Sequence, residues 1–186
     1  MLAMAEKPPE AFSSDPRWPV DRNTDSNWED ITMNKESAME WFGALKDALW
    51  SSGHHLDKKA KILEIGTGGG ILLHSLRQQG YDIVGIDGRP RHNGALPIAA
   101  ARVERLPFAD ETFDVVLSRG TFSHSYKQDS AKMLEEVGRV LKPGGIFYGL
   151  PHGRLLDGPE VTMTAKGMAV MPISTQHYSF FKKASG

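Results

Sequence analysis

In the segment Glu64-Ile65-Gly66-Thr67-Gly68-Gly69-Gly70, glycines stand at every second position, 66, 68 and 70, beginning two residues after an acidic residue. Glycine tolerates positive φ and lets a ligand lie against the backbone, so such a loop can cradle a small molecule. A nicotinamide- or flavin-binding loop of the form G-x-G-x-x-G would place its third glycine at position 71, which is Ile71. An acid followed by Gly66, Gly68 and Gly70 suits a nucleoside that carries an amino acid better than it suits a pyrophosphate.

A second acidic residue, Asp87, ends an apolar stretch 21 positions after Gly66. Its carboxylate can accept hydrogen bonds from two ribose hydroxyls, and the charge strengthens both bonds. An Asp-Gly pair after a strand is also a common turn signal, which is the alternative for Asp87-Gly88. Because the glycine loop stands at the right distance, we favour the ribose role.

Hydrophobic periodicity places both features among alternating strands and helices. Helices are expected at residues 34–50, 71–79 and 130–141, and strands at 61–65, 82–86, 98–103, 113–118 and 145–150. Residues 176–181 alternate like an edge strand, with part of 161–170 as its candidate partner. This order predicts an α/β fold, a doubly wound, mostly parallel sheet with helices on both faces. Ligands bind such sheets at the carboxyl ends of the strands, where the glycine loop and Asp87 lie.

Length and composition set limits on the remaining functions. The 186 residues allow one domain, residues 34–186, preceded by a proline-containing irregular arm of residues 1–33 that carries Trp18 and Trp28. A net charge of −1 gives no electrostatic reason to expect nucleic acid or an anionic membrane as partner. With no cysteine, disulfides, thiolate nucleophiles and cysteine-bound zinc are excluded. His54-His55 lacks a third ligand at a sensible spacing, so no metal site is expected. We expect a cytoplasmic protein, since the first residues lack the apolar core of a signal peptide.

Four ordered segments now resemble a known family. Residues 62–70 and 84–87 resemble motifs I and II of class I methyltransferases, which use S-adenosylmethionine. Residues 106–116, LPFADETFDVV, are similar to a stretch of the subfamily typified by ubiquinone and menaquinone biosynthesis methyltransferases. Residues 139–145, RVLKPGG, match that subfamily's entry to the fifth strand. The resemblance covers roughly residues 61–150 and implies a Rossmann-like sheet of seven strands with a reversed last strand.

The resemblance also implies a site for S-adenosylmethionine across the carboxyl edge of that sheet. The loop would hold the methionine part, Asp87 the ribose hydroxyls, and Gly88 would lie beside the adenine. The backbone at Val103 and Glu104 would meet the adenine edge, and Ser118 and Arg119 would lie near the methionine carboxylate and the sulfonium. A surface ion pair is the alternative for Arg119. The implied cofactor-binding residues are thus Glu64, Gly66, Thr67, Gly68, Gly70, Asp87, Gly88, Val103, Glu104, Ser118 and Arg119.

The sequence departs from the family pattern in three places. Arg102 stands where members usually carry an acid that contacts the adenine amino group. Residues 89–97 contain two prolines and an Asn-Gly turn, so a loop or a single turn is expected in place of a helix. The region after residue 150 is short, so the acceptor pocket is either shallow or completed by another subunit, which leaves a homodimer open.

Methyl transfer from a sulfonium is an in-line displacement in which the protein mainly aligns donor and acceptor. A base is needed only where the acceptor must lose a proton, and the candidates are His124, His152, His177 and Tyr178. We favour His124 and His152, which follow the fourth and fifth strands at the ligand edge, and the alternative is that they are surface or structural histidines. The N-P-P-Y type motif for adenine or glutamine amino groups is absent after residue 118, which favours a small-molecule acceptor methylated at O, N or C over a nucleic-acid base. The alternatives are a non-catalytic cofactor-binding partner or regulator and a nicotinamide-dependent oxidoreductase, against which Ile71 argues.

Overall fold

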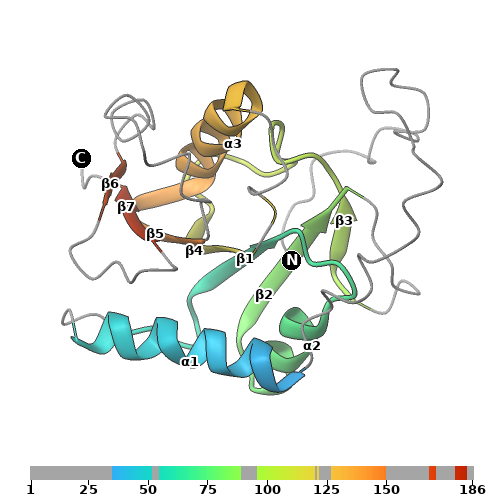
Figure 1. Cartoon of the computed structure of the whole chain (residues 1–186), viewed down its shortest axis with the longest axis vertical. Helices are drawn as coiled ribbons and strands as arrows, with labels where there is room; N and C mark the ends of the chain where they lie inside the picture. The colour runs from blue at the N-terminus through green and yellow to red at the C-terminus, as the bar shows by residue number, and fades with distance from the viewer. Residues whose placement is uncertain are drawn as a thin grey trace.

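The computed structural model describes residues 35–51, 55–88, 96–119, 121, 127–149, 168–170 and 179–183. In these residues a seven-stranded sheet separates two layers of helix (Figure 1). Helices α1 (Lys35–Ser51) and α2 (Ile71–Gln78) lie on one face of the sheet, and α3 (Lys127–Val140) lies on the other. The strands are β1 (Lys61–Ile65), β2 (Asp82–Asp87), β3 (Ile98–Ala100), β4 (Phe113–Ser118), β5 (Leu141–Gly149), β6 (Met168–Val170) and β7 (Ser179–Lys183).

The strand order is β3-β2-β1-β4-β5-β7-β6, which confirms the predicted α/β class. The five strands β1 to β5 pair in parallel, whereas β7 runs antiparallel to both β5 and β6, so the reversed last strand is also confirmed. The chain builds outward from β1 to β3 on one side and then returns to place β4 on the other side. The carboxyl ends of β1 and β4, where Ile65 pairs with Ser118, therefore form the switch point at which doubly wound sheets bind ligands.

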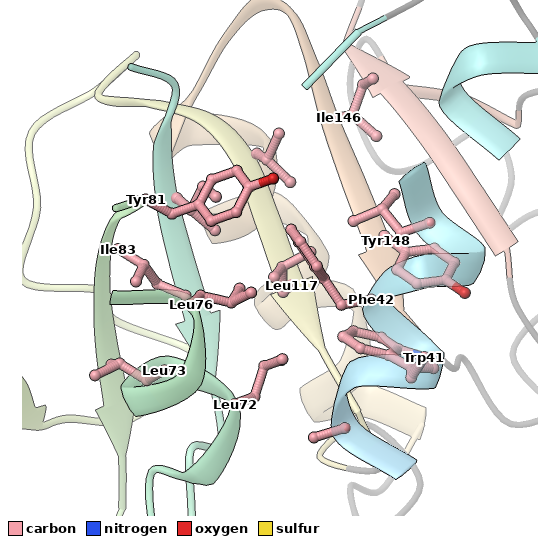
Figure 2. Packing of buried hydrophobic residues seen from close by; sticks show 14 of the residues in the cluster. Trp41, Phe42, Leu72, Leu73, Leu76, Tyr81, Ile83, Leu117, Ile146 and Tyr148 are labelled. Atoms are coloured by element: carbon pink, nitrogen blue, oxygen red, sulfur yellow. The ribbon is translucent and has the colours of Figure 1, made fainter. Parts of the chain in front are cut away.

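The apolar spacing of α1 decides which of its side chains are buried, and Figure 2 shows this face of the core. Trp41 stacks on Tyr148 of β5 with ring centroids 4.7 Å apart, and Phe42 meets Tyr81 edge-on at 5.3 Å. The buried side chains of α2 complete the layer, and together they form one apolar cluster with the sheet. Helix α3 buries Met133, Leu134, Val137 and Val140 in a second cluster on the opposite face.

Up to residue 150, three predicted elements have a boundary that lies more than one residue from its predicted position. The third strand ends at Ala100 rather than at 103, because the chain turns at residues 103–104 after the Ala101 N–H has donated a last bond to β2, at the Asp87 carbonyl (3.1 Å). Helix α3 begins at Lys127 and ends at Val140, and Leu141 already pairs with Phe113 as the first residue of β5. Residues 143–144 lie inside β5 at an irregularity, where the register moves from Leu141 opposite Phe113 to Ile146 opposite Val115.

The tail prediction was right in its pairing and wrong in its position within the sheet. β7 pairs with β6, which lies within the predicted partner region 161–170. It is not an edge strand, however, because β6 covers its outer side in the described part of the chain. The predicted arm of residues 1–33 and residues 89–95 of the loop predicted at 89–97 lie outside the described residues.

Candidate cofactor site at the carboxyl edge of the sheet

The glycine loop joins β1 to α2 and is held against the end of β2. The backbone N–H groups of Gly66 and Thr67 both donate to the Ile86 carbonyl, at 2.8 and 3.2 Å. Gly66, Gly68 and Gly70 all have positive φ, of 74°, 52° and 73°, which favours glycine at each position. At Gly66 an added Cβ would collide with the Thr121 hydroxyl, whereas at Gly68 it would point into open space. The loop is therefore tight on its inner side and open where a ligand can approach.

Asp87 contacts this loop directly. Its Oδ2 accepts a hydrogen bond from the Gly68 N–H at 2.8 Å, so the end of β2 and the centre of the loop are joined. The side chain is half-buried, and Gly88 beyond it is exposed. The structure thus brings together the two sequence features, the glycine loop and the acid after the second strand.

Glu64 is the last residue but one of β1, which lies between β2 and β4 in the sheet. It is opposite Gly85 in β2 and Leu117 in β4, and only 5% of the residue is exposed. Burial raises the pKa of its carboxyl to about 8, a hydrogen bond from the Leu73 backbone opposes that rise, and the negative charge of Asp87 adds to it. A carboxyl with this pKa is mostly protonated at neutral pH. The acid that introduces the loop is therefore a largely neutral group in the folded chain.

Four buried polar atoms at this edge have no hydrogen-bond partner: Glu64 Oε2, Thr67 Oγ1, Ser118 Oγ and Arg119 Nη1. They come from the carboxyl end of β1, from the end of β4 and the residue after it, and from the loop between β1 and α2, so they gather around the switch point. Leaving such a group unsatisfied costs ~1–3 kcal/mol, and native proteins leave few of them. The described residues provide no ion pair for Arg119, so the surface ion pair that was its alternative is not seen. Open polar atoms of this kind are what a bound polar ligand would satisfy.

Val103 and Glu104 lie in the turn that follows β3, on the other side of Asp87 from the glycine loop. Val103 is buried in the same apolar cluster as α3, and Glu104 is half-buried. The Asp87 carbonyl accepts a hydrogen bond from the Ala101 N–H, so the segment that leads into this turn is joined to Asp87. The side chain of Asp87 in turn binds Gly68 of the glycine loop. The described residues of the predicted site thus lie along one edge of the sheet.

Comparison with known proteins agrees with this geometry. Residues 63–149 match the family described as "Methyltransferase domain". The chain is 29% identical over 122 residues to a ubiquinone biosynthesis O-methyltransferase of Mesorhizobium japonicum, covering 60% of the chain and 45% of the relative. Residues 63–149 are thus similar to the methyltransferase domain of class I S-adenosylmethionine-dependent enzymes. The predicted resemblance to the ubiquinone and menaquinone subfamily is confirmed.

Two further similarities mark the breadth of this methyltransferase family. An eEF1A lysine and N-terminal methyltransferase of Mus musculus is 31% identical over 140 residues, covering 64% of the chain and 20% of the relative. The chain thus spans less than half the length of both curated relatives. A solved structure has the same fold with a TM-score of 0.54 at 20% identity, covering 76% of this chain and 78% of the other. It is the 1,6-didemethyltoxoflavin-N1-methyltransferase of Burkholderia thailandensis, with 1,6-didemethyltoxoflavin and S-adenosylhomocysteine bound.

Sequence reasoning missed what two of the methyltransferase motifs do in this fold. Asp114, in the LPF-containing motif, pairs with Lys142 of RVLKPGG at 2.8 Å and accepts a hydrogen bond from the Lys61 N–H, also at 2.8 Å. These contacts join the starting ends of β1, β4 and β5, far from the glycine loop. Arg139, the first residue of RVLKPGG, bonds to the loop after β3. The sequence signal was present, since Asp114 and Lys142, like Asp110 and Arg139, are oppositely charged residues of the two motifs. Hydrophobic periodicity alone gave no reason to pair them.

The candidate bases cannot be placed in this site. His124 and His152 lie outside the described residues, as do His54, His177 and Tyr178. Among the residues that the structure does describe, no group of three histidine or acidic side chains is arranged to hold a metal ion. None of the described helices is both long enough and apolar enough to cross a membrane.

Proposed function

We propose that this chain binds S-adenosylmethionine at the carboxyl edge of its sheet and transfers the methyl group to a small-molecule acceptor. The observation that carries the proposal is the set of four unpartnered, buried polar atoms beside the positive-φ glycine loop. An amino-acid nucleoside offers an ammonium, a carboxylate and hydroxyls that match such groups. The residues present therefore fit the cofactor that the family uses.

We assign the residues along the edge as the family pattern suggests. Glu64 and the loop residues Gly66, Thr67, Gly68 and Gly70 hold the methionine part, and Ser118 and Arg119 face its carboxylate and the sulfonium. Asp87 accepts the ribose hydroxyls, which requires its carboxylate to share or exchange the bond from Gly68. Gly88, Val103 and Glu104 border the adenine.

The bound cofactor supplies a methyl group that is already activated on a sulfonium, so the chain's own task is chiefly alignment. The loop and β4 fix the donor side at the switch point. A general base is required only for an acceptor that loses a proton, and His124 and His152 remain the proposed candidates. An acceptor site completed by a second copy of the chain stays a prediction.

The choice of a small-molecule acceptor is supported by the names of two similar proteins, one in ubiquinone biosynthesis and one acting on a toxoflavin precursor. The eEF1A methyltransferase relative supports the other candidate, a protein acceptor. Incubating the chain with methyl-labelled S-adenosylmethionine and a cell extract separates the two. Label in a low-molecular-weight product other than S-adenosylmethionine supports the proposal, and product label confined to the protein fraction contradicts it. Boiled extract and heat-denatured chain are the controls.

A further inference from the structure

The loop between β3 and β4 is bound to α3 by two side chains, Arg139 and Glu136. Arg139 Nη2 donates to the Leu106 carbonyl at 3.0 Å, and Nη1 donates to the Phe108 carbonyl at 2.8 Å. Glu136 Oε2 accepts the Leu106 N–H at 2.7 Å, so the backbone of Leu106 is held through both its polar groups. A segment without regular structure thus has its backbone bonds supplied by helix side chains.

The guanidinium of Arg139 has no free donor in this arrangement. Besides the two carbonyls, it bonds to Glu136 Oε1 through Nε at 2.6 Å, to Glu136 Oε2 through Nη2 at 2.7 Å and to Asp110 Oδ1 through Nη1 at 2.8 Å. Five bonds match the five N–H groups of a guanidinium. Lysine has three rotatable N–H groups on one nitrogen and cannot span the same acceptors.

The electrostatics of the pair favour its charged form. Burial alone would raise the pKa of Glu136, but hydrogen bonds from Arg139 and from the Leu106 backbone outweigh it, and the pKa is lowered. The hydrogen bonds of Arg139 to Glu136 and to Asp110 outweigh its own burial and raise its pKa further above the usual range. The pair is therefore ionised near neutral pH, and its hold on the loop does not depend on pH in that range.

The bonded segment lies directly after the residues assigned to the adenine. Val103 and Glu104 stand three and two positions before Leu106, respectively, and Val103 and Leu106 are buried in one cluster with Met133 and Leu134 of α3. At the other end of the same turn, Ala101 is bonded to Asp87. The adenine side of the site is thus fixed at one end by the ribose residue and at the other by Arg139 and Glu136.

We propose that Arg139 and Glu136 are positioning residues that hold the loop backbone at Val103 and Glu104 in place to read the adenine edge of the cofactor. The inference rests on the proposed function, since it assumes that this edge binds the cofactor. Neither side chain needs to touch the ligand. Their effect reaches it through the backbone of residues 103–106.

The test compares S-adenosylhomocysteine with S-inosylhomocysteine, in which hypoxanthine replaces adenine. Hypoxanthine carries a hydrogen on N1 and an oxygen on C6, so both hydrogen bonds at that edge reverse their direction. We expect the intact chain to prefer S-adenosylhomocysteine by about tenfold or more in calorimetric titration. In Arg139→Met that preference should shrink toward one, because affinity for the adenine ligand falls while affinity for the hypoxanthine ligand changes little.

A matched control removes a different cation from the same motif. Lys142→Met breaks the pair with Asp114 at the far end of the sheet and should lower stability while leaving the ligand preference unchanged. Should Arg139→Met fail to fold, Arg139→Lys keeps the charge but loses most of the five bonds, and it should show the same loss of preference.

The outcomes separate this inference from the proposed function. No binding of either ligand by the intact chain overturns the proposed function and this inference with it. Binding without a preference for adenine overturns the reading role of the loop. A preference that survives in the folded Arg139 variants shows that the pair is merely structural and overturns the inference alone.

Discussion

Glu64 illustrates how one residue can serve a ligand and at the same time weaken the empty fold. It is 5% exposed, its Oε2 has no partner, and its pKa is raised to about 8 from 4.5. The unfolded chain releases this proton above about pH 4.5, whereas the folded chain keeps it until about pH 8. Between these two pH values the folded chain holds one proton more than the unfolded chain. The stability that Glu64 contributes is therefore fully present below about pH 4.5 and is lost as the pH rises toward about 8, so the free energy of unfolding falls over this range.

Glu64→Gln should remove that dependence. Between about pH 5 and pH 8 we expect the free energy of unfolding of the original chain to fall relative to that of the variant by roughly 1.4 kcal/mol per pH unit. Urea denaturation of both proteins across this range measures the difference, and comparing slopes cancels the titration of other groups. Parallel curves would show that Glu64 is ionised in the folded chain.

Arg119 gives a second prediction at the residue scale. If its buried Nη1 faces the cofactor carboxylate, Arg119→Met should weaken S-adenosylhomocysteine binding by about tenfold, as expected for a lost charged hydrogen bond. Binding of 5′-methylthioadenosine, which lacks the amino-acid part, should not change. Arg77→Met, an exposed arginine on α2, is the control. Equal weakening of both ligands by Arg119→Met would place the side chain elsewhere in the site.

The loop between β1 and α2 depends on glycine for different reasons at different positions. Gly66 has φ of 74° and faces Thr121, whose hydroxyl donates to the Ile65 carbonyl at 3.1 Å. Gly69 has no positive φ, and an added Cβ there would meet nothing within 4 Å. Substitutions at Gly66 and Gly69 therefore distinguish the effect of backbone geometry from the effect of ligand access.

Gly66→Ala should lower the free energy of unfolding by about 2 kcal/mol or more, because strain and collision with Thr121 add together. Gly69→Ala should change it by less than about 1 kcal/mol. Thermal unfolding of the two variants side by side measures the contrast. Similar losses in both would mean that the loop adjusts freely and that its geometry is not fixed by Gly66.

For the whole molecule, the two apolar clusters hold α1 and α2 on one face of the sheet and α3 on the other. Phe42 is fully buried between α1 and the sheet, so Phe42→Ala should cost ~3–5 kcal/mol. Glu40→Ala, at an exposed position of the same helix, should change stability by no more than about 0.5 kcal/mol. Chemical denaturation compares them, and a Phe42→Ala cost as small as that of the control would contradict this packing.

The order and type of the elements could be predicted from the sequence because hydrophobic period is a local signal. β1 and β4 have the predicted bounds, and the glycine loop and Asp87 meet as their positions after two strands suggested. The bonds of Arg139 to the loop after β3 could not be predicted, since they join residues about 30 positions apart through backbone atoms. Nor does alternation in β7 reveal which strand covers it. Contacts between residues far apart in the sequence, unlike hydrophobic period, cannot be read from a local segment of the chain.

The most direct test of the account is calorimetric titration of the intact chain with S-adenosylmethionine and S-adenosylhomocysteine, beside Asp87→Ala and Asp82→Ala. Asp82 is exposed at the opposite end of the same strand, so it controls for loss of a carboxylate from β2. We predict binding that weakens by about tenfold or more in Asp87→Ala and is unchanged in Asp82→Ala. An intact chain that binds neither ligand, or an Asp87→Ala variant that binds as well as the original, would contradict a cofactor site at the glycine loop.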